Sequence, residues 1–409
     1  MTTRQTTLDT GRERPLDPAT ARGALPEARS TTAPSARIAP DETLACPACR
    51  TPLSGPGPAW SCSRCALAFP DDAGLPVLLP PGAAHIRDMQ AHIHDDLSRL
   101  HNARKLPLYW QTGFRYVFNL LMAKHARMLA RLHPRAGERH LDVGCQDGMI
   151  LSQIVHRWGV RGTGVDVSED SLRLALQRND LGLRYYLADA LSLPFREGSF
   201  DTVHSLGTME HVPHPERFVA ELARVARPGG RVLFDMINRH DGLTLHGVER
   251  WWAERRGRGA AARATSMGIG HDPATFLDPG EVRAMCKAAG LRVRRISVYN
   301  AFVPLWVDTR LPRILARLRG RKVDFVGRPL VPGPGKEGDA GGNGADPRGS
   351  PGREPGAGGT GPGAGGLAAR RAGALALKGI LPVAELLDLP FTALGYGNSF
   401  YVLAERPER

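Results

Sequence analysis

Short apolar runs alternate with amphipathic segments between His140 and Asp235. This alternation is typical of a parallel sheet whose strands are joined by crossover helices. We therefore expect strands over 140–143, 162–165, 183–187, 200–205 and 231–236. Helices are expected over 149–158, 169–178 and 215–226, a further helix and strand over 279–289 and 291–298, and a last strand over 399–404.

The segments outside this region differ in composition and suggest a multi-part chain. Residues 1–43 lack apolar periodicity, and 327–366 are dominated by Gly and Pro, so neither segment can build a packed core. The expected organisation is a disordered tail at 1–43, a cysteine-bearing unit at 44–82, a helical connector at 83–135, a core at 136–300 with a cap insertion at about 239–275, a basic helical extension at 301–326, a disordered insertion at 327–366, and a C-terminal helix with the final strand at 367–409.

The cap insertion carries Trp251 and Trp252 beside a run of Arg, Gly and Ala. An insertion at this point of the alternation overhangs the carboxyl ends of the strands, where ligands bind in open α/β sheets. We interpret it as a substrate cap. The two tryptophans fit a cap or an ordinary core equally well.

The formal charge of +13 on 409 residues is unevenly distributed. Residues 245–325 hold 16 lysines and arginines against seven acidic residues. Such a region suits nucleic acid, an acidic substrate or an anionic membrane surface, and an arginine-rich solvated surface is an equal alternative.

No stretch approaches the about 20 apolar residues of a spanning helix, and the N-terminus has no apolar signal core. We expect no transmembrane segment and a cytoplasmic protein. The apolar stretch 374–387 is interpreted as a docking helix, with membrane-surface binding as the less favoured alternative.

Four of the six cysteines form two CxxC pairs, Cys46 with Cys49 and Cys62 with Cys65, separated by 12 residues. Two such turns can deliver four thiolates to one Zn²⁺ and leave no position open for a substrate. The sequence therefore predicts a structural zinc site. Redox or disulfide use of the four thiols is the alternative.

A glycine-containing turn follows the first expected strand, in the segment 141–148 that reads LDVGCQDG. Gly144 and Gly148 allow backbone amides to approach a ligand at a helix N-terminus. The spacing differs from the dinucleotide fingerprint, and Asp142 before the first glycine suits a ligand with an amino group better than a pyrophosphate.

Two more acids follow later strands. Asp166 ends the second strand and can accept both hydroxyls of a ribose. Asp189, followed by Ala190, comes after the third strand and can accept a hydrogen bond from an adenine amino group. Turn and capping duty is the structural alternative for both carboxylates.

Together with the segments 193–195, 199–203, 205–212 and 224–230, these motifs closely resemble class I methyltransferases over about residues 138–300 and the last strand. The resemblance implies an α/β fold, a doubly wound, seven-stranded, mostly parallel sheet with an antiparallel last strand. It also implies S-adenosyl-L-methionine as cofactor, with Asp142, Gly144 and Gly148 around its methionine moiety, Asp166 at the ribose, and Asp189 with Ala190 at the adenine. The remaining candidate cofactor-binding residues are Cys145, Gln146, Val167, Ser205 and Leu206.

Two positions of the turn, Cys145 and Gln146, differ from the others in their expected role. Many relatives have glycine where this chain has Gln146, which puts the local geometry of the turn in question. Cys145 is interpreted as a small packing residue.

The cysteine-bearing unit resembles the small zinc-ribbon family that activates certain tRNA and translation-factor methyltransferases. In that family the ribbon binds a separate catalytic subunit. Because the unit is fused here, it either packs on its own neighbour or recognises a substrate.

The segment 207–214 leaves the fourth strand at the expected active-site edge and reads GTMEHVPH. If the methyl acceptor is a hydroxyl, a base must take its proton, and histidine suits this role. His211 is the first candidate and His214 the second. The favoured alternative is that Glu210 and His211 only shape the pocket.

The segments 234–239 and 276–282 further resemble ubiquinone-biosynthesis O-methyltransferases. This resemblance implies a small-molecule acceptor, apolar or lipid-like, under the cap. An RNA methyltransferase that uses the ribbon and the basic region is the main alternative, although aromatic content is only 6%. The third hypothesis is a catalytically silent cofactor-binding scaffold, for which Gln146 is the only indication.

Overall fold

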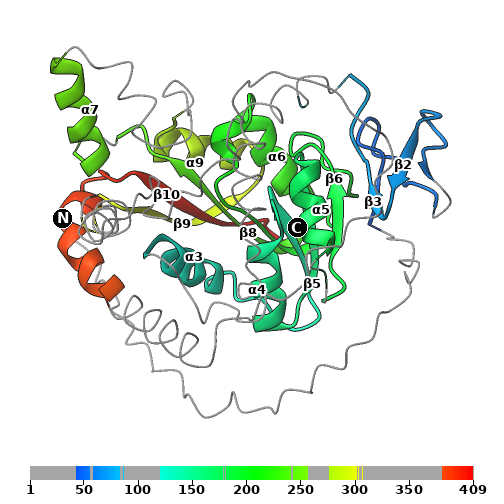
Figure 1. Ribbon diagram of the computed structural model, residues 1–409, viewed down its shortest axis with the longest axis horizontal. Coiled ribbons are helices and arrows are strands. Elements are labelled where there is room, and N and C mark those ends of the chain that lie inside the picture. Colours follow the sequence, from blue (N-terminus) through cyan, green and yellow to red (C-terminus); the bar gives the residue numbers. More distant parts are fainter. Residues whose placement is uncertain are drawn as a thin grey trace, which may run out of the picture. The chain divides into compact units, whose positions relative to one another are not determined.

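The computed structural model describes residues 43–55, 59–82, 86, 120–177, 179, 181–240, 243–256, 276–301, 303, 306 and 380–408 (Figure 1). The expected tail (apart from Thr43), most of the connector, most of the cap, the basic extension and the Gly/Pro-rich insertion lie outside these residues.

A seven-stranded sheet forms the centre of the catalytic region, in the order β6-β5-β4-β7-β8-β10-β9. All neighbours pair in parallel except β10, which runs antiparallel to both β8 and β9. The fold class expected from the sequence is confirmed. The strands are β4 (Arg139–Val143), β5 (Arg161–Asp166), β6 (Arg184–Leu187), β7 (Phe200–Ser205), β8 (Ala226–Ile237), β9 (Arg292–Tyr299) and β10 (Ser399–Glu405).

Helices cover both faces of this sheet, with α3 and α4 on one face and α6 and α9 on the other (Figure 1). The helices are α3 (Leu120–Ala130), α4 (Met149–Trp158), α5 (Glu169–Gln177), the short helix η4 (Met209–His211), α6 (Pro215–Val225), α7 (Leu245–Arg255), α9 (Pro279–Ala288) and one over residues 380–393. Among the described residues, none of the helices combines the length and the apolar character needed to cross a bilayer.

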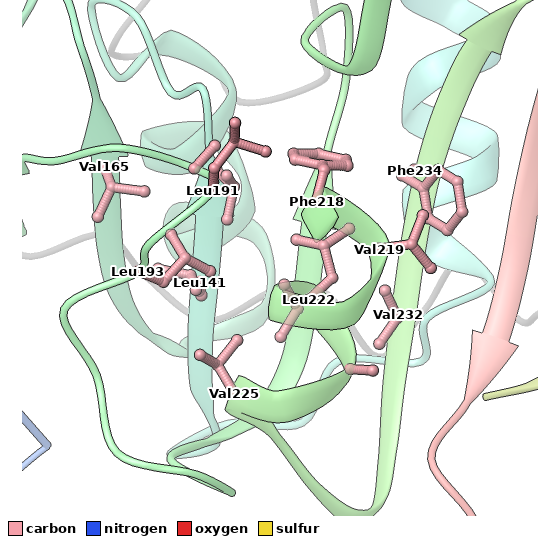
Figure 2. Close-up of a cluster of buried hydrophobic side chains, with 14 of the residues drawn as sticks. Leu141, Val165, Leu191, Leu193, Phe218, Val219, Leu222, Val225, Val232 and Phe234 are labelled. Atoms are coloured by element: carbon pink, nitrogen blue, oxygen red, sulfur yellow. The ribbon is translucent and has the colours of Figure 1, made fainter. Parts of the chain in front are cut away.

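Side chains alternate along β8 and build the two layers of core. Leu233 packs with α3 and α4, whereas Val232 and Phe234 point to the opposite face. Figure 2 shows these two residues against Phe218 and Val219 of α6. The alternation follows from the two-residue period of a strand and leaves the carboxyl ends of the parallel strands as the exposed edge for a site.

The N-terminal unit is a three-stranded antiparallel sheet of β1 (Ala59–Ser61), β2 (Ala68–Asp72) and β3 (Leu75–Pro76). β3 covers only the first two residues of the apolar run 75–79. After β3 the chain joins the edge of the large sheet, where Val77 bridges Leu187 in parallel and the Leu78 amide donates to the Leu187 carbonyl at 2.8 Å. The apolar run is therefore shared between the two sheets.

Candidate functional site

The turn between β4 and α4 requires glycine at two positions. Gly144 and Gly148 have φ of 79° and 69°, in the left-handed region that side chains rarely adopt. A Cβ on Gly144 would collide with Thr208, and one on Gly148 with the hydroxyl of Tyr185. The backbone of this turn is therefore packed closely on both sides.

Gln146 also takes a left-handed conformation, with φ of 49°. Its amide donates to Asp166 Oδ2 at 2.8 Å, and the Ser168 amide donates to Asp166 Oδ1 at 2.7 Å. The carboxylate thus fastens the turn to the end of β5. Glycine would adopt this left-handed φ without the steric cost that a side chain incurs.

A cleft opens at the carboxyl ends of the parallel strands. The predicted residues that line it are Gly144, Gln146, Asp166, Val167, Asp189, Ala190 and His211. The lining residues that the sequence did not single out are Val165, Ala188, Gly207, Thr208 and Val212. The sequence did place the segment 207–214 at this edge, because it leaves β7, but of its residues only Glu210, His211 and His214 were considered individually.

Asp189 also has a turn role, because its Oδ1 accepts a hydrogen bond from the Leu191 amide at 2.8 Å. The structural alternative for Asp166 and Asp189 is therefore present in the fold. Both residues also line the cleft, so the turn role does not remove them from the candidate site.

Five predicted cofactor residues support the turn without lining the cleft. Asp142 and Cys145 are buried, and Gly148 lies beneath Tyr185. The Ser205 hydroxyl donates to the Val143 carbonyl at 2.6 Å, and Leu206 is partly buried against the core. Cys145 packs close to Gly164, which agrees with its interpretation as a packing residue.

A row of buried polar side chains runs beneath the turn, and apart from Asp142 its members were absent from the sequence predictions. His140 Nδ1 lies 2.7 Å from Thr202 Oγ1, and its Nε2 lies 2.9 Å from His204 Nδ1. His204 Nε2 lies 3.2 Å from Asp142 Oδ1 without the alignment of a hydrogen bond, and Asp142 Oδ2 is buried without a partner. Burial lowers the pKa of His140 to about 3, and that of His204 well below its ordinary value, so both rings are neutral.

Asp142 ends this row directly under the turn. Burial, and after it the charge of Asp166, raises the pKa of Asp142 well above its ordinary value. A positive charge placed nearby would lower that pKa again. The buried carboxyl therefore suits a site for a cationic ligand.

The two candidate histidines are separated by the structure. His211 ends the short helix η4 and lines the cleft. His214 precedes α6, and its side chain is 62% exposed, with Nδ1 3.6 Å from Glu216 Oε1. Of the two, only His211 can reach a molecule in the cleft.

A buried pair of acids adjoins this part of the cleft. Asp235 accepts hydrogen bonds from the Gly207 amide at 2.8 Å and from the Tyr299 hydroxyl at 3.0 Å. Glu210 Oε2 is buried without a hydrogen bond. Burial, with the charge of Asp235 as the second cause, raises the pKa of Glu210 to about 8, and burial raises the pKa of Asp235 to about 6. Glu210 is therefore mostly protonated at neutral pH.

The four cysteines of the ribbon form one cluster, in which all sulfur atoms lie within 4.8 Å of one another. Cys49 Sγ and Cys62 Sγ are 3.5 Å apart, far beyond the about 2.05 Å of a disulfide bond. Zn–S bonds of about 2.3 Å in a tetrahedron place the sulfur atoms about 3.8 Å apart, so this donor set fits one zinc ion.

The ribbon contacts the loop that follows Asp189 and Ala190. The Ala45 amide donates to the Pro194 carbonyl at 2.9 Å, and Arg50 Nη1 donates to the Leu193 carbonyl at 2.7 Å. Arg50 also pairs with Glu221 at 3.0 Å. Of the two roles considered for a fused ribbon, packing on its own neighbour is thus present in the structure.

Comparisons with known proteins agree with this architecture. A sequence profile described as a methyltransferase domain matches residues 141–234. The ubiquinone biosynthesis O-methyltransferase of Azoarcus sp. (strain BH72) is 32% identical over 195 residues, which cover 46% of this chain and 79% of that protein. The ubiquinone biosynthesis O-methyltransferase of Thiobacillus denitrificans is 32% identical over 195 residues, which cover 46% of this chain and 80% of that protein.

A solved structure of phosphoethanolamine N-methyltransferase 2 from Haemonchus contortus, in complex with phosphomonomethylethanolamine and S-adenosylhomocysteine, has a TM-score of 0.38 and 20% identity, and covers 70% of this chain and 52% of that chain. The curated relatives are matched over more than two thirds of their length, and the sheet order is the expected one. The chain therefore belongs to the class I S-adenosylmethionine-dependent methyltransferases.

Proposed function

We propose that the protein transfers a methyl group from S-adenosylmethionine to a hydroxyl oxygen of a small molecule. The observation that carries this proposal is that His211 lines the same cleft as Gly144 and Asp166. A group able to take a hydroxyl proton thus shares one space with the turn and the carboxylate expected to hold the cofactor. The names of the relatives, O-methyltransferases of ubiquinone biosynthesis, support an oxygen acceptor.

The cofactor, when bound, supplies an activated methyl group on a sulfonium. Asp166 would accept the ribose hydroxyls, and Asp189 with Ala190 would contact the adenine. Gly144 and Gln146 would surround the methionine moiety. Asp142 would act from below the turn, where its unpartnered Oδ2 can balance the positive charge of the ligand. Cys145, Gly148, Ser205 and Leu206 would position the turn, and Val167 would lie beside the ribose.

The residues of the cleft can accelerate the transfer mainly by orientation, because an in-line displacement needs no covalent intermediate with the protein. His211 would accept the proton of the acceptor hydroxyl. Val212, which lines the cleft together with His211, offers an apolar contact that suits an apolar acceptor better than a charged one.

The four-cysteine cluster would hold a structural zinc ion. The sulfur geometry supports this assignment, and the closed donor set leaves no ligand position for catalysis. Zinc would stabilise the ribbon, which has little core of its own, and through it the loop after Ala190.

The proposal is tested by incubating the protein with methyl-labelled cofactor and either a small-molecule extract or total RNA. We expect label in small molecules, with its transfer rate reduced about 10²-fold or more by His211→Gln. His214→Gln is the matched control, because that side chain is exposed and outside the cleft, and we expect it to leave the rate unchanged. Label in RNA alone, or equal rates for both variants, would overturn the proposal.

A further inference from the structure

The helix over residues 380–393 turns its polar side chains toward the protein. Asp388 is buried and accepts hydrogen bonds from the backbone amides of Ala301 at 2.7 Å and Val303 at 2.9 Å. Glu385 pairs with Lys124 at 3.1 Å and with Arg127. The acids of this helix are thus satisfied by internal partners.

The opposite side of the same helix is apolar and exposed. Its large side chains, and that of a leucine just after it, are 45% to 75% accessible to solvent. The inner side of this helix also buries Leu381 and Ala384, as an ordinary surface helix does, but the outer side lacks the charges that such a helix shows to water. This apolar outer side indicates a match to an apolar environment. The exposed residues are Ile380, Val383, Leu386, Leu387 and Leu389 on the helix and Leu394 in the turn that follows it.

A second exposed apolar group lies on α7. Trp251 and Trp252 are 46% and 51% exposed and meet edge to face, with ring centres 5.4 Å apart. The tryptophans are therefore not core residues, the alternative that the sequence left open. The guanidinium of Arg255 lies 4.2 Å from the centre of the Trp251 ring, and that of Arg256 lies 5.1 Å from the centre of the Trp252 ring.

The two groups belong to one region of the molecule. The Leu245 amide at the start of α7 donates to the Ala301 carbonyl at 2.9 Å, and the Ala301 amide in turn donates to Asp388. Figure 1 shows α7 and the red helix near the C-terminal end of the sequence next to each other at one edge. We call the five exposed apolar residues of the helix and Leu394 just after it, together with Trp251 and Trp252, the apolar surface.

Positive charge accompanies the apolar surface. Arg255 and Arg256 flank the tryptophans, and the sequence just before the helix, residues 367–379, contains Arg370, Arg371 and Lys378 but no acid. Tryptophans enter the interface between headgroups and acyl chains, whereas arginines stay at the level of the headgroups. Leucines on an exposed helix face add apolar area that a bilayer can bury, and nearby cations add attraction to anionic headgroups.

We infer that the apolar surface binds the interface of an anionic lipid bilayer, with the helix over 380–393 and α7 lying on the membrane without crossing it. A second copy of the chain would bury the same leucines, but it would place the arginines of both copies against one another. Anionic headgroups complement Arg255 and Arg256 beside the tryptophans, and for this reason a bilayer is favoured over a second copy. The surface is distinct from the cofactor cleft and does not depend on the identity of the methyl acceptor.

The test uses the full-length protein and sedimentation with vesicles of phosphatidylcholine alone or with phosphatidylglycerol. We expect binding to the anionic vesicles that weakens as salt is raised. The double variant Leu386→Glu, Leu387→Glu should lower the partition coefficient at least tenfold, because it puts two anions on the surface. The matched control is Leu181→Glu, since Leu181 is 37% exposed on a loop away from the apolar surface, and it should bind as the wild type does.

Circular dichroism, thermal unfolding and titration with S-adenosylmethionine should be the same for all three proteins, because the double variant changes only exposed side chains. Absence of vesicle binding by the wild type would overturn the inference, and so would equal binding by the double variant. A wild-type dimer that the double variant dissociates, without vesicle binding, would assign the surface to a second copy and would also overturn it.

Discussion

Asp166 Oδ2 accepts a hydrogen bond from the backbone amide of Gln146 at 2.8 Å, and this amide belongs to a residue held at a φ of 49°. A left-handed conformation costs a residue with a side chain about 1 to 2 kcal/mol. The carboxylate that lines the cofactor cleft thus also holds the strained part of the turn. With the proposed role of Asp166 at the ribose, loop shape and ligand recognition are coupled through one side chain.

We expect Gln146→Gly to raise the free energy of unfolding by about 1 kcal/mol, because glycine adopts positive φ without the steric cost. The measurement is chemical denaturation followed by circular dichroism. Gln146→Ala is the control, since it removes the same side chain but keeps the Cβ, and we expect no gain. Equal gains for both variants would show that strain at this position is not the cause.

Asp166→Asn should weaken binding of S-adenosylmethionine by a factor of ten or more, which corresponds to about 1.4 kcal/mol. The amide keeps the size of the side chain but loses the charge and one of the two acceptor oxygens. Isothermal titration measures the affinity. Asp201→Asn is the matched control, because Asp201 pairs with Arg227 at the opposite end of β7 and lies outside the cleft. Undiminished affinity in Asp166→Asn would contradict the assigned role.

Purified protein should contain one zinc ion per chain, measurable by elemental analysis. Cys62→Ser should lose it, whereas Cys286→Ala should keep it, because Cys286 is buried in the core away from the cluster. Chelation should lower the midpoint of thermal unfolding, since a structural zinc site contributes folding free energy directly. Full zinc content in Cys62→Ser would exclude the four-thiolate site.

The local pattern of apolar and polar residues predicted most elements of the core, because strands and helices of this fold are short and bounded by turn residues. The strand Phe200–Ser205 and the helix Met149–Trp158 coincide with their predicted ranges. β8 begins five residues before its predicted start at Arg231. Its extra residues pair with the C-terminal chain, as Gly229 donates to the Arg406 carbonyl at 2.7 Å. A contact between residues so far apart leaves no trace in the local pattern.

In the site, too, residues at strand ends could be predicted from the local sequence, whereas contacts between distant segments could not. Asp166 and Asp189 were recognised because each follows a strand, and strand ends meet at one edge of the sheet. His140 and His204 looked like ordinary polar positions within strands. Their hydrogen bond could not be predicted locally, because it forms only when β4 and β7 pair side by side. Likewise, Glu210 and Asp235 become an acid pair only when η4 folds back onto β8.

The acid pair predicts how stability depends on pH. Burial raises the pKa of Glu210 to about 8 from 4.5, so between these values the folded protein holds a proton that the unfolded chain releases. The folded state then binds more protons, and the free energy of unfolding falls as pH rises through this window. The contribution is fully present below about pH 4.5 and is lost above about pH 8.

Glu210→Gln removes this titration while keeping a neutral side chain of similar shape. We therefore expect the fall in the midpoint of thermal unfolding between pH 6 and pH 9 to be smaller in the variant than in the wild type. Asp235, with a pKa of about 6, adds a dependence of the same sign below that range in both proteins. Glu216→Gln is the control, because that side chain is exposed and should leave the pH dependence unchanged. If Glu210→Gln and the wild type lost stability in parallel up to pH 9, Glu210 would not hold its proton in the folded state.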